Sequence, residues 1–78
     1  MPKSIHSKRQ EQLCNLLVEA RLDAGLTQQQ VADGLGHPQS YVAKIEGGER
    51  RLDVIEYIEF CECLKVDPSS FLRLVQGK

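Results

Sequence analysis

The fold of this chain is decided by residues 26–53, which read LTQQQVADGLGHPQSYVAKIEGGERRLD. Thr27 and Gln30 have the spacing of a capping box, which predicts a helix that begins there and ends before Gly36. Pro38 suits the first position of a second helix, because its missing backbone amide would have no partner there. A connection of only three or four residues forces two helices to cross steeply and closely. The stretch therefore predicts two helices joined by a tight turn.

The two predicted helices have an inner and an outer face. Ala32 stands where a larger side chain would hold the helices apart, and Gly36 stands where the chain must reverse, in the positive-φ region that glycine adopts at little cost. Gly34 costs up to ~1 kcal/mol relative to alanine, so we expect the first of these helices to be weak on its own. The inner face carries larger apolar residues at helical spacing, namely Val31, Leu35, Val42 and Ile45. The outer face of the second helix begins with Gln39, Ser40 and Lys44.

Three further helices are predicted around this unit. The first spans about residues 7–24 after a capping-box pattern at Ser7, the fourth begins at Asp53, which Glu56 follows at the same spacing, and the fifth begins after Asp67. Their apolar positions recur at helical spacing: Leu13, Leu16, Leu17, Ala20 and Ala24 in the first, Val54, Ile55, Ile58, Cys61 and Leu64 in the fourth, and Phe71, Leu72 and Val75 in the fifth. The prediction is a compact all-α fold of five helices, with one domain over residues 9–76, its helix-turn-helix at about 28–47, and an N-terminal extension over residues 1–8.

The N-terminal extension has three open interpretations. It lengthens the first helix, forms a basic arm with Lys3, Lys8 and Arg9, or stays disordered. Its sequence has no apolar stretch behind the basic residues, which argues against a secretory signal. No apolar run approaches the ~18 residues of a membrane span, so we expect a cytoplasmic protein without a membrane partner.

The composition fits one soluble domain but does not by itself indicate a nucleic-acid partner. The chain has 78 residues, 41% of them hydrophobic and 27% charged, and a net charge of −1. Residues 1–26 carry a net charge of +1, residues 27–51 carry 0 and residues 52–78 carry −2. A DNA-binding surface would therefore come from the first two thirds of the chain, with the acidic fourth helix turned away.

The cysteines and histidines do not predict a metal site or an enzyme. Cys14, Cys61 and Cys63 are odd in number and lack C-x-x-C spacing. We expect reduced thiols used as small apolar residues, with a redox or intermolecular role as the alternative. His6 and His37 lie far apart without clustered acids, so no metal or cofactor is expected. Because the chain also lacks a nucleophile–base motif and a phosphate-cradling glycine loop, we do not expect an enzyme.

Two motifs carry a resemblance to a known family. They are RLDAGLTQQQVA, residues 21–32, and SYVAKIEGG, residues 40–48, and the spacing of helices, glycines and core positions is more specific than any dipeptide in them. Over about residues 9–75 the chain resembles the phage-repressor (Cro/cI-type), or XRE, family of helix-turn-helix proteins. The resemblance implies a lambda-repressor-like domain that binds double-stranded DNA and regulates transcription, with its third helix in the major groove.

The resemblance implies base contacts at the start of that helix. Gln39 matches the main base-contacting position, and its amide can pair with adenine through a donor and an acceptor. Ser40 and Lys44 match two further groove-facing positions, where the lysine suits either guanine or a phosphate. Gln28 matches a residue that contacts a phosphate and braces the recognition glutamine. Pro38 departs from the family pattern, since many relatives carry a capping serine or threonine there.

The resemblance also implies backbone contacts and a structural pair. Arg50 and Arg51 match a loop that follows the DNA backbone, with a solvated charge pair as the alternative. Tyr41 is expected to pack partly against the domain, with its hydroxyl within reach of a phosphate. Arg21 and Glu46 match a pair that joins the first helix to the end of the third.

We also expect a symmetric homodimer that reads a palindrome, because one helix reads only a few base pairs. The fifth helix offers a surface for it, since it carries more large apolar residues than one face can bury. The candidate residues are Phe71, Leu72, Leu74 and Val75, with Tyr57 or Phe60 of the fourth helix. The alternative is that they complete the core of the monomer.

The regulatory role is open at this stage. A repressor is expected. Autoregulation, a restriction–modification controller role and activation are open as further possibilities. The competing hypothesis is an antitoxin-like or other interaction module that keeps the fold, with a toxin or a polymerase as protein partner. Gln28, Gln39 and the Arg50-Arg51 loop favour DNA binding, because a pure interaction domain has no reason to retain them.

Overall fold

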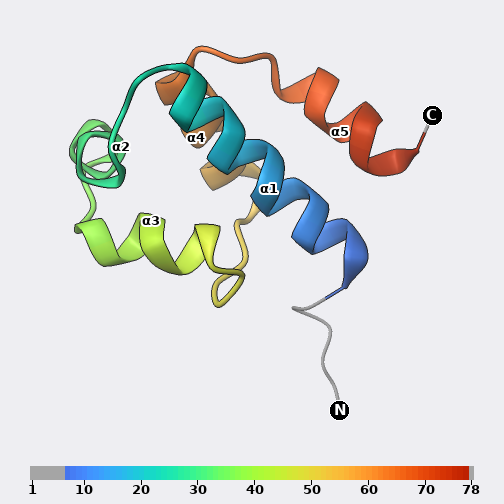
Figure 1. Cartoon of the computed structure of the whole chain (residues 1–78), viewed down its shortest axis with the longest axis horizontal. Helices are drawn as coiled ribbons and strands as arrows, with labels where there is room; N and C mark the ends of the chain where they lie inside the picture. The colour runs from blue at the N-terminus through green and yellow to red at the C-terminus, as the bar shows by residue number, and fades with distance from the viewer. Residues whose placement is uncertain (1–6, 78) are drawn as a thin grey trace.

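The computed structural model describes residues 7–77 and contains five α-helices over that range (Figure 1). They are α1 (Lys8–Asp23), α2 (Gln28–Leu35), α3 (Gln39–Glu46), α4 (Val54–Leu64) and α5 (Pro68–Gln76). The predicted all-α fold is confirmed. Within residues 7–77, no helix has both the length and the apolar character needed to cross a membrane. Most of the predicted N-terminal extension lies outside the described residues, and its last residue, Lys8, is already the first residue of α1.

The predicted capping motifs start most of the helices. Capping boxes begin α2, with Thr27, and α4, with Asp53, while the Asp67 side chain accepts a hydrogen bond from the first turn of α5. Gly36 ends α2 with a φ of 73°, the positive value expected for the turn. Pro38 is a correction, because it precedes α3 instead of opening it. Its ψ of 158° is extended, and it supplies no side-chain cap, so α3 begins one residue later than predicted.

The helices enclose one hydrophobic core. Helix α1 packs against α3, α4 and α5, and α2 packs against both α3 and α4 (Figure 1). The predicted inner face of the α2–α3 unit is confirmed, with Val31, Ala32, Val42 and Ile45 fully buried or nearly so and Leu35 partly buried. The larger buried residues that join them come from the other helices, chiefly Leu17, Tyr57, Phe60 and Leu64. This core fixes the crossing of α2 and α3 that positions the outer face of α3.

The register of α4 differs from the prediction. Three of its predicted core residues are exposed, with exposed fractions of 71% for Val54, 64% for Ile55 and 36% for Ile58. Cys61 and Leu64 are buried as predicted, and Tyr57 and Phe60 take the place of the other three, so that the buried residues follow the i, i+3, i+4, i+7 spacing of one helical face. Because α4 has apolar residues all around its axis, its packing against α1 and α2 decides which of them are buried.

Gly34 permits the close approach of α2 to α4. A Cβ atom at this position would lie 3.0 Å from the Sγ of Cys63, and that thiol also donates a weak hydrogen bond to the carbonyl of Val31. Gly34 therefore lowers the helix propensity of α2, as expected, but its missing side chain lets α2 approach α4 closely. All three cysteines are free thiols, and burial raises the pKa of Cys14 and Cys61. Residues 7–77 contain no group of three or more potential metal ligands.

The contact between Gly34 and Cys63 predicts a non-additive response to substitution. Gly34→Ala gains about 1 kcal/mol of helix propensity but places a Cβ 3.0 Å from the Cys63 sulfur, so we expect no net gain in the free energy of unfolding. In a Cys63→Ala background the sulfur is absent, and the same change should stabilise the protein by about 1 kcal/mol. Urea denaturation of the four proteins tests this. Equal effects of Gly34→Ala in both backgrounds would show that the sulfur imposes no constraint.

The predicted pair between Arg21 and Glu46 is present and joins the last turn of α1 to the end of α3. Arg21 Nε donates to Glu46 Oε2 at 2.7 Å and Nη2 donates to Oε1 at 3.1 Å, with side-chain exposures of only 12% and 6%. Arg21 Nη1 also donates to the carbonyl of Leu26, at 2.9 Å, in the turn before α2. A two-pronged, largely buried ion pair of this kind fixes orientation as well as distance.

We expect this pair to show strong coupling in a double-mutant cycle. Arg21→Met and Glu46→Leu should each lower the free energy of unfolding by roughly 3–5 kcal/mol, because each leaves a buried charge without its partner. The double mutant should lose much less than the sum. The more exposed pair between Arg50 and Glu56, with exposures of 39% and 23%, is the control and should couple more weakly. Strictly additive losses at Arg21 and Glu46 would contradict the assignment.

Candidate nucleic-acid interface

The first turns of α3 present the predicted base-contacting residues to the surface. Gln39 and Ser40 are the first two residues of α3, and Lys44 lies four residues after Ser40 on the same face. All three side chains are exposed. Their neighbours Val42 and Ile45 are buried in the core. The helix therefore has a polar, exposed outer face and an apolar inner face that is packed in the core.

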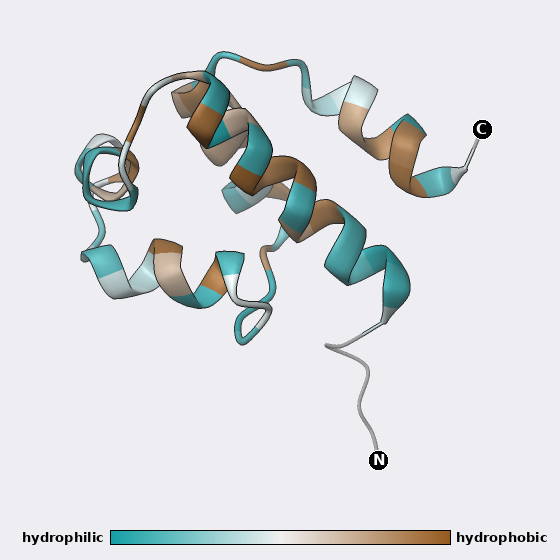
Figure 2. Cartoon of the chain, viewed as in Figure 1, coloured by the Kyte–Doolittle hydropathy of each residue, from teal (hydrophilic) through white to brown (hydrophobic). Residues whose placement is uncertain are grey.

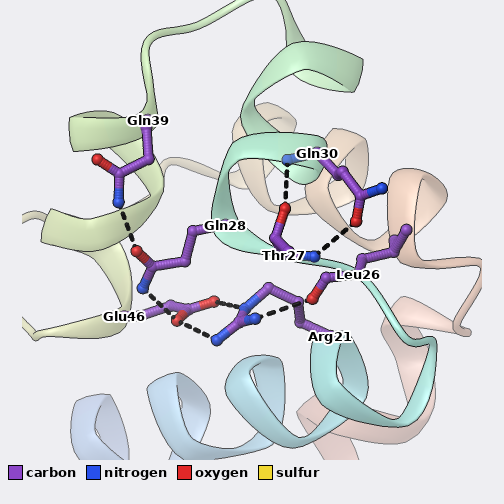
Figure 3. A network of polar contacts seen from close by, with 7 residues as sticks. All are labelled: Arg21, Leu26, Thr27, Gln28, Gln30, Gln39 and Glu46. Atoms are coloured by element: carbon purple, nitrogen blue, oxygen red, sulfur yellow. Dashed lines mark hydrogen bonds and ion pairs between the residues drawn. The ribbon is translucent and has the colours of Figure 1, made fainter.

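A chain of polar contacts holds the Gln39 side chain in place (Figure 3). Gln39 Nε2 donates to Gln28 Oε1 at 2.6 Å, and Gln28 Nε2 donates to Glu46 Oε1 at 2.8 Å. Since Glu46 is paired with Arg21, the chain runs from the start of α3 through α2 to α1. The expected bracing of Gln39 by Gln28 is present in the protein alone. A side chain ordered in this way loses less conformational freedom when it binds a ligand.

The ring of Tyr41 is part of an aromatic stack. Its side chain is 9% exposed and its ring lies parallel to that of His37, with centroids 3.8 Å apart. The Arg50 guanidinium lies 4.7 Å from the centroid of the Tyr41 ring. Burial is the main cause that raises the pKa of Tyr41. The stack joins the turn before α3 to the loop after it, and helical spacing does not predict it because His37 precedes the helix.

Arg50 and Arg51 lie between α3 and α4 but have different surroundings. Arg50 forms a two-pronged ion pair with Glu56, at 2.9 and 3.2 Å, and donates to the backbone carbonyl of Arg51 at 3.0 Å. Hydrogen bonding from Arg50, followed by that from the backbone amide of Asp53, lowers the pKa of Glu56 to about 2. Arg51 is exposed. The first role of Arg50 is thus to order this loop, a partnership that we did not predict because Glu56 was assigned only to a capping box.

The predicted dimer residues divide into buried and exposed ones. Tyr57 and Phe60, with exposed fractions of 6% and 0%, belong to the core of the protomer, and the Tyr57 hydroxyl donates to the carbonyl of Pro68 at 2.6 Å. Offering them as partner contacts was wrong, because their ring surfaces are already covered. Phe71 packs against the core and Val75 is half-buried. Leu72 and Leu74 are exposed, in the apolar second half of α5 that Figure 2 shows in brown.

An apolar surface remains open where α4 meets α5. Val54, Ile55 and Ile58 form a stripe on α4, and Val54 and Leu72 line one shallow groove together. We call these four residues the α4–α5 patch. Their neighbours in the groove include Leu13 and Leu52. Exposed apolar side chains gathered in this way commonly mark an interaction surface.

Residues 17–71 match the Helix-turn-helix family. No curated protein sequence matches the chain. Among solved structures, an XRE-family like protein from Pseudomonas syringae pv. tomato str. DC3000 is 47% identical, with a TM-score of 0.86 over 95% of this chain and 90% of that one. The two proteins therefore agree in sequence as well as in fold.

Restriction–modification controller proteins share the fold. C.AhdI from Aeromonas hydrophila is 26% identical, with a TM-score of 0.74 over 80% of this chain and 90% of that one. C.Esp1396I, solved as a tetramer in complex with its natural 35 base-pair operator, is 21% identical, with a TM-score of 0.80 over 92% of this chain and 95% of that one. From the family match and the close relative, the chain belongs to the XRE family of helix-turn-helix DNA-binding transcription regulators.

Proposed function

We propose that the protein is a sequence-specific repressor that reads a palindromic operator with α3. The observation that carries this proposal is the order of the Gln39 side chain, which is held through Gln28 by the ion pair of Glu46 and Arg21. A freely solvated glutamine would have no need of such support. In the major groove, the amide of Gln39 would meet an adenine edge.

The other polar residues of this surface extend the contact. Ser40 and Lys44 are exposed on α3 as Gln39 is, so we assign them to neighbouring base edges, with Lys44 suited to guanine. We assign Arg51 and Gln28 to phosphates, which position the protein without reading sequence. Arg50 and Tyr41 support the loop between α3 and α4 through their stacked side chains. Either one would contact a phosphate directly only if the edge of this stack faces the duplex.

Self-association follows from the amount of sequence that one helix can read. Each good bidentate contact discriminates by ~1–3 kcal/mol, which leaves a single copy weak against ~10⁶ or more competing genomic sites. Two copies with recognition helices about 34 Å apart would read both halves of a palindrome. The α4–α5 patch is the surface that we assign to this homodimer, and Leu74, exposed on the same helix as Leu72, is a further candidate. The operator complex of the C.Esp1396I tetramer supports such an assembly.

The likeness to C.Esp1396I, solved in complex with its operator, supports operator binding, and we propose that the operator of this protein lies at its own promoter. A dimer seated on an operator that overlaps the promoter would exclude polymerase, which is repression. It would act in the cytoplasm, where it meets DNA.

Substitutions in α3 and in the loop should have separable effects on DNA binding. Gln39→Ala should weaken binding to a selected site by roughly 1–3 kcal/mol and change binding to random duplex little. Arg51→Ala should weaken both equally and reduce the log–log salt slope by about 0.9, the value for one phosphate contact. Fluorescence anisotropy at several salt concentrations measures both. Gln29→Ala is the matched control, since Gln29 bonds Asp33 within α2. Equal losses on both duplexes for Gln39→Ala would remove Gln39 as a base reader.

The dimer surface can be tested without disturbing the core. Val54 is the first residue of α4, where glutamate interacts favourably with the helix dipole, so Val54→Glu should leave the protomer folded. We expect sedimentation at micromolar concentration to show a monomer. In a DNA-binding assay, this monomer should bind a full palindrome no more tightly than a half-site. Leu22→Glu is the control, because Leu22 is equally apolar and 60% exposed but lies on α1. A Val54→Glu protein that stays dimeric would exclude the α4–α5 patch as the interface.

A further inference from the structure

The contacts around Glu46 impose a direction on two amide side chains. A glutamine amide can donate through its nitrogen or accept through its oxygen, whereas a carboxylate only accepts. Glu46 Oε1 lies 2.8 Å from the Gln28 side chain, so Gln28 must turn its nitrogen toward Glu46. Its oxygen then faces Gln39, which must turn its own nitrogen toward Gln28, at 2.6 Å. We call this series of donors and acceptors the Gln39–Gln28–Glu46 relay.

We propose that Glu46 determines which base Gln39 prefers, by fixing the direction of this relay from a position that does not touch DNA. The inference rests on the proposed function and deepens it. One N–H of Gln39 is used by Gln28, which leaves one N–H and the oxygen for a base edge. A donor beside an acceptor matches the N7 acceptor and the N6 amino donor of adenine. With the relay reversed, Gln39 would accept from Gln28 and present two N–H groups, which match the O6 and N7 acceptors of guanine.

Glu46→Gln should reverse the relay because Arg21 has donors only. The new amide must place its oxygen toward one Arg21 donor and its nitrogen toward the other. The Nε contact is the shorter, at 2.7 Å against 3.1 Å at Oε1, so we expect the oxygen to take the place of Oε2 and the nitrogen to take the place of Oε1. The nitrogen then faces Gln28 and donates to it. Gln28 turns over, and Gln39 turns over in response.

The first test needs no DNA. In the free wild-type protein, NMR should show one hydrogen-bonded, slowly exchanging side-chain amide proton on each of Gln28 and Gln39. Glu46→Gln should abolish the slow exchange at Gln39, which becomes an acceptor, and keep it at Gln28. Arg21→Lys is the matched control, because it weakens the same ion pair but leaves the carboxylate, and it should keep both slow protons. Unchanged exchange at Gln39 in Glu46→Gln would overturn the proposal that Glu46 fixes the direction of the relay, whatever the protein does with DNA.

The second test reads base preference. Site selection from random duplexes, at a temperature where thermal melting shows every variant folded, should give the wild type and Arg21→Lys an adenine at the position lost in Gln39→Ala. In Glu46→Gln the ratio of guanine to adenine there should rise by roughly 5- to 150-fold, the worth of one bidentate contact.

The outcomes separate the inference from the function on which it rests. An adenine preference unchanged in Glu46→Gln would overturn the inference and leave DNA reading by Gln39 intact. The same shift in Arg21→Lys would also overturn it, because displacement of α3 would then explain the effect. A wild-type protein with the slow amide protons but no selected sequence would instead refute the proposed function.

Discussion

The arrangement of this small domain depends on the ion pair between Arg21 and Glu46. It is nearly buried, and it connects the end of α1, the turn that carries Leu26 and the end of α3. Through Gln28 it also reaches the start of α2. Buried ion pairs are weak evidence for stability, since apolar residues of similar volume often replace them without loss. An apolar pair, however, could not orient the side-chain amides of Gln28 and Gln39. This difference favours a role of the ion pair in specificity.

Local motifs of the fold were predictable because their partners lie three or four residues apart. Thr27 with Gln30 and Asp53 with Glu56 form the expected capping boxes, and Gly36 takes the expected positive φ. The burial pattern of α4 was not predictable in the same way. Its sequence, VIEYIEFCECL, is apolar at every position except the three glutamates, so no single face stands out. Only packing against α1 and α2 decides which residues of α4 are buried.

The contacts of the candidate site likewise include some that were predictable and one that was not. The Arg21–Glu46 pair and the contact between Gln28 and Gln39 were expected from the family resemblance, since neither follows from sequence spacing. The ion pair of Arg50 with Glu56 was missed, because it links a loop to a helix across six residues whose conformation the sequence leaves open. Tertiary contacts of this kind have no periodic signature. They become visible only when the turn geometry is known.

The recognition helix shows why such contacts are needed. Pro38 supplies no side-chain cap, and eight residues are too few to form a stable helix alone. Contacts with other parts of the protein must therefore fix the position and direction of α3. At its start, Tyr41 is held between His37 and Arg50, and at its end Glu46 is held by Arg21. A helix fixed at both ends by its neighbours can present the same outer face in every copy, which two symmetric half-sites require.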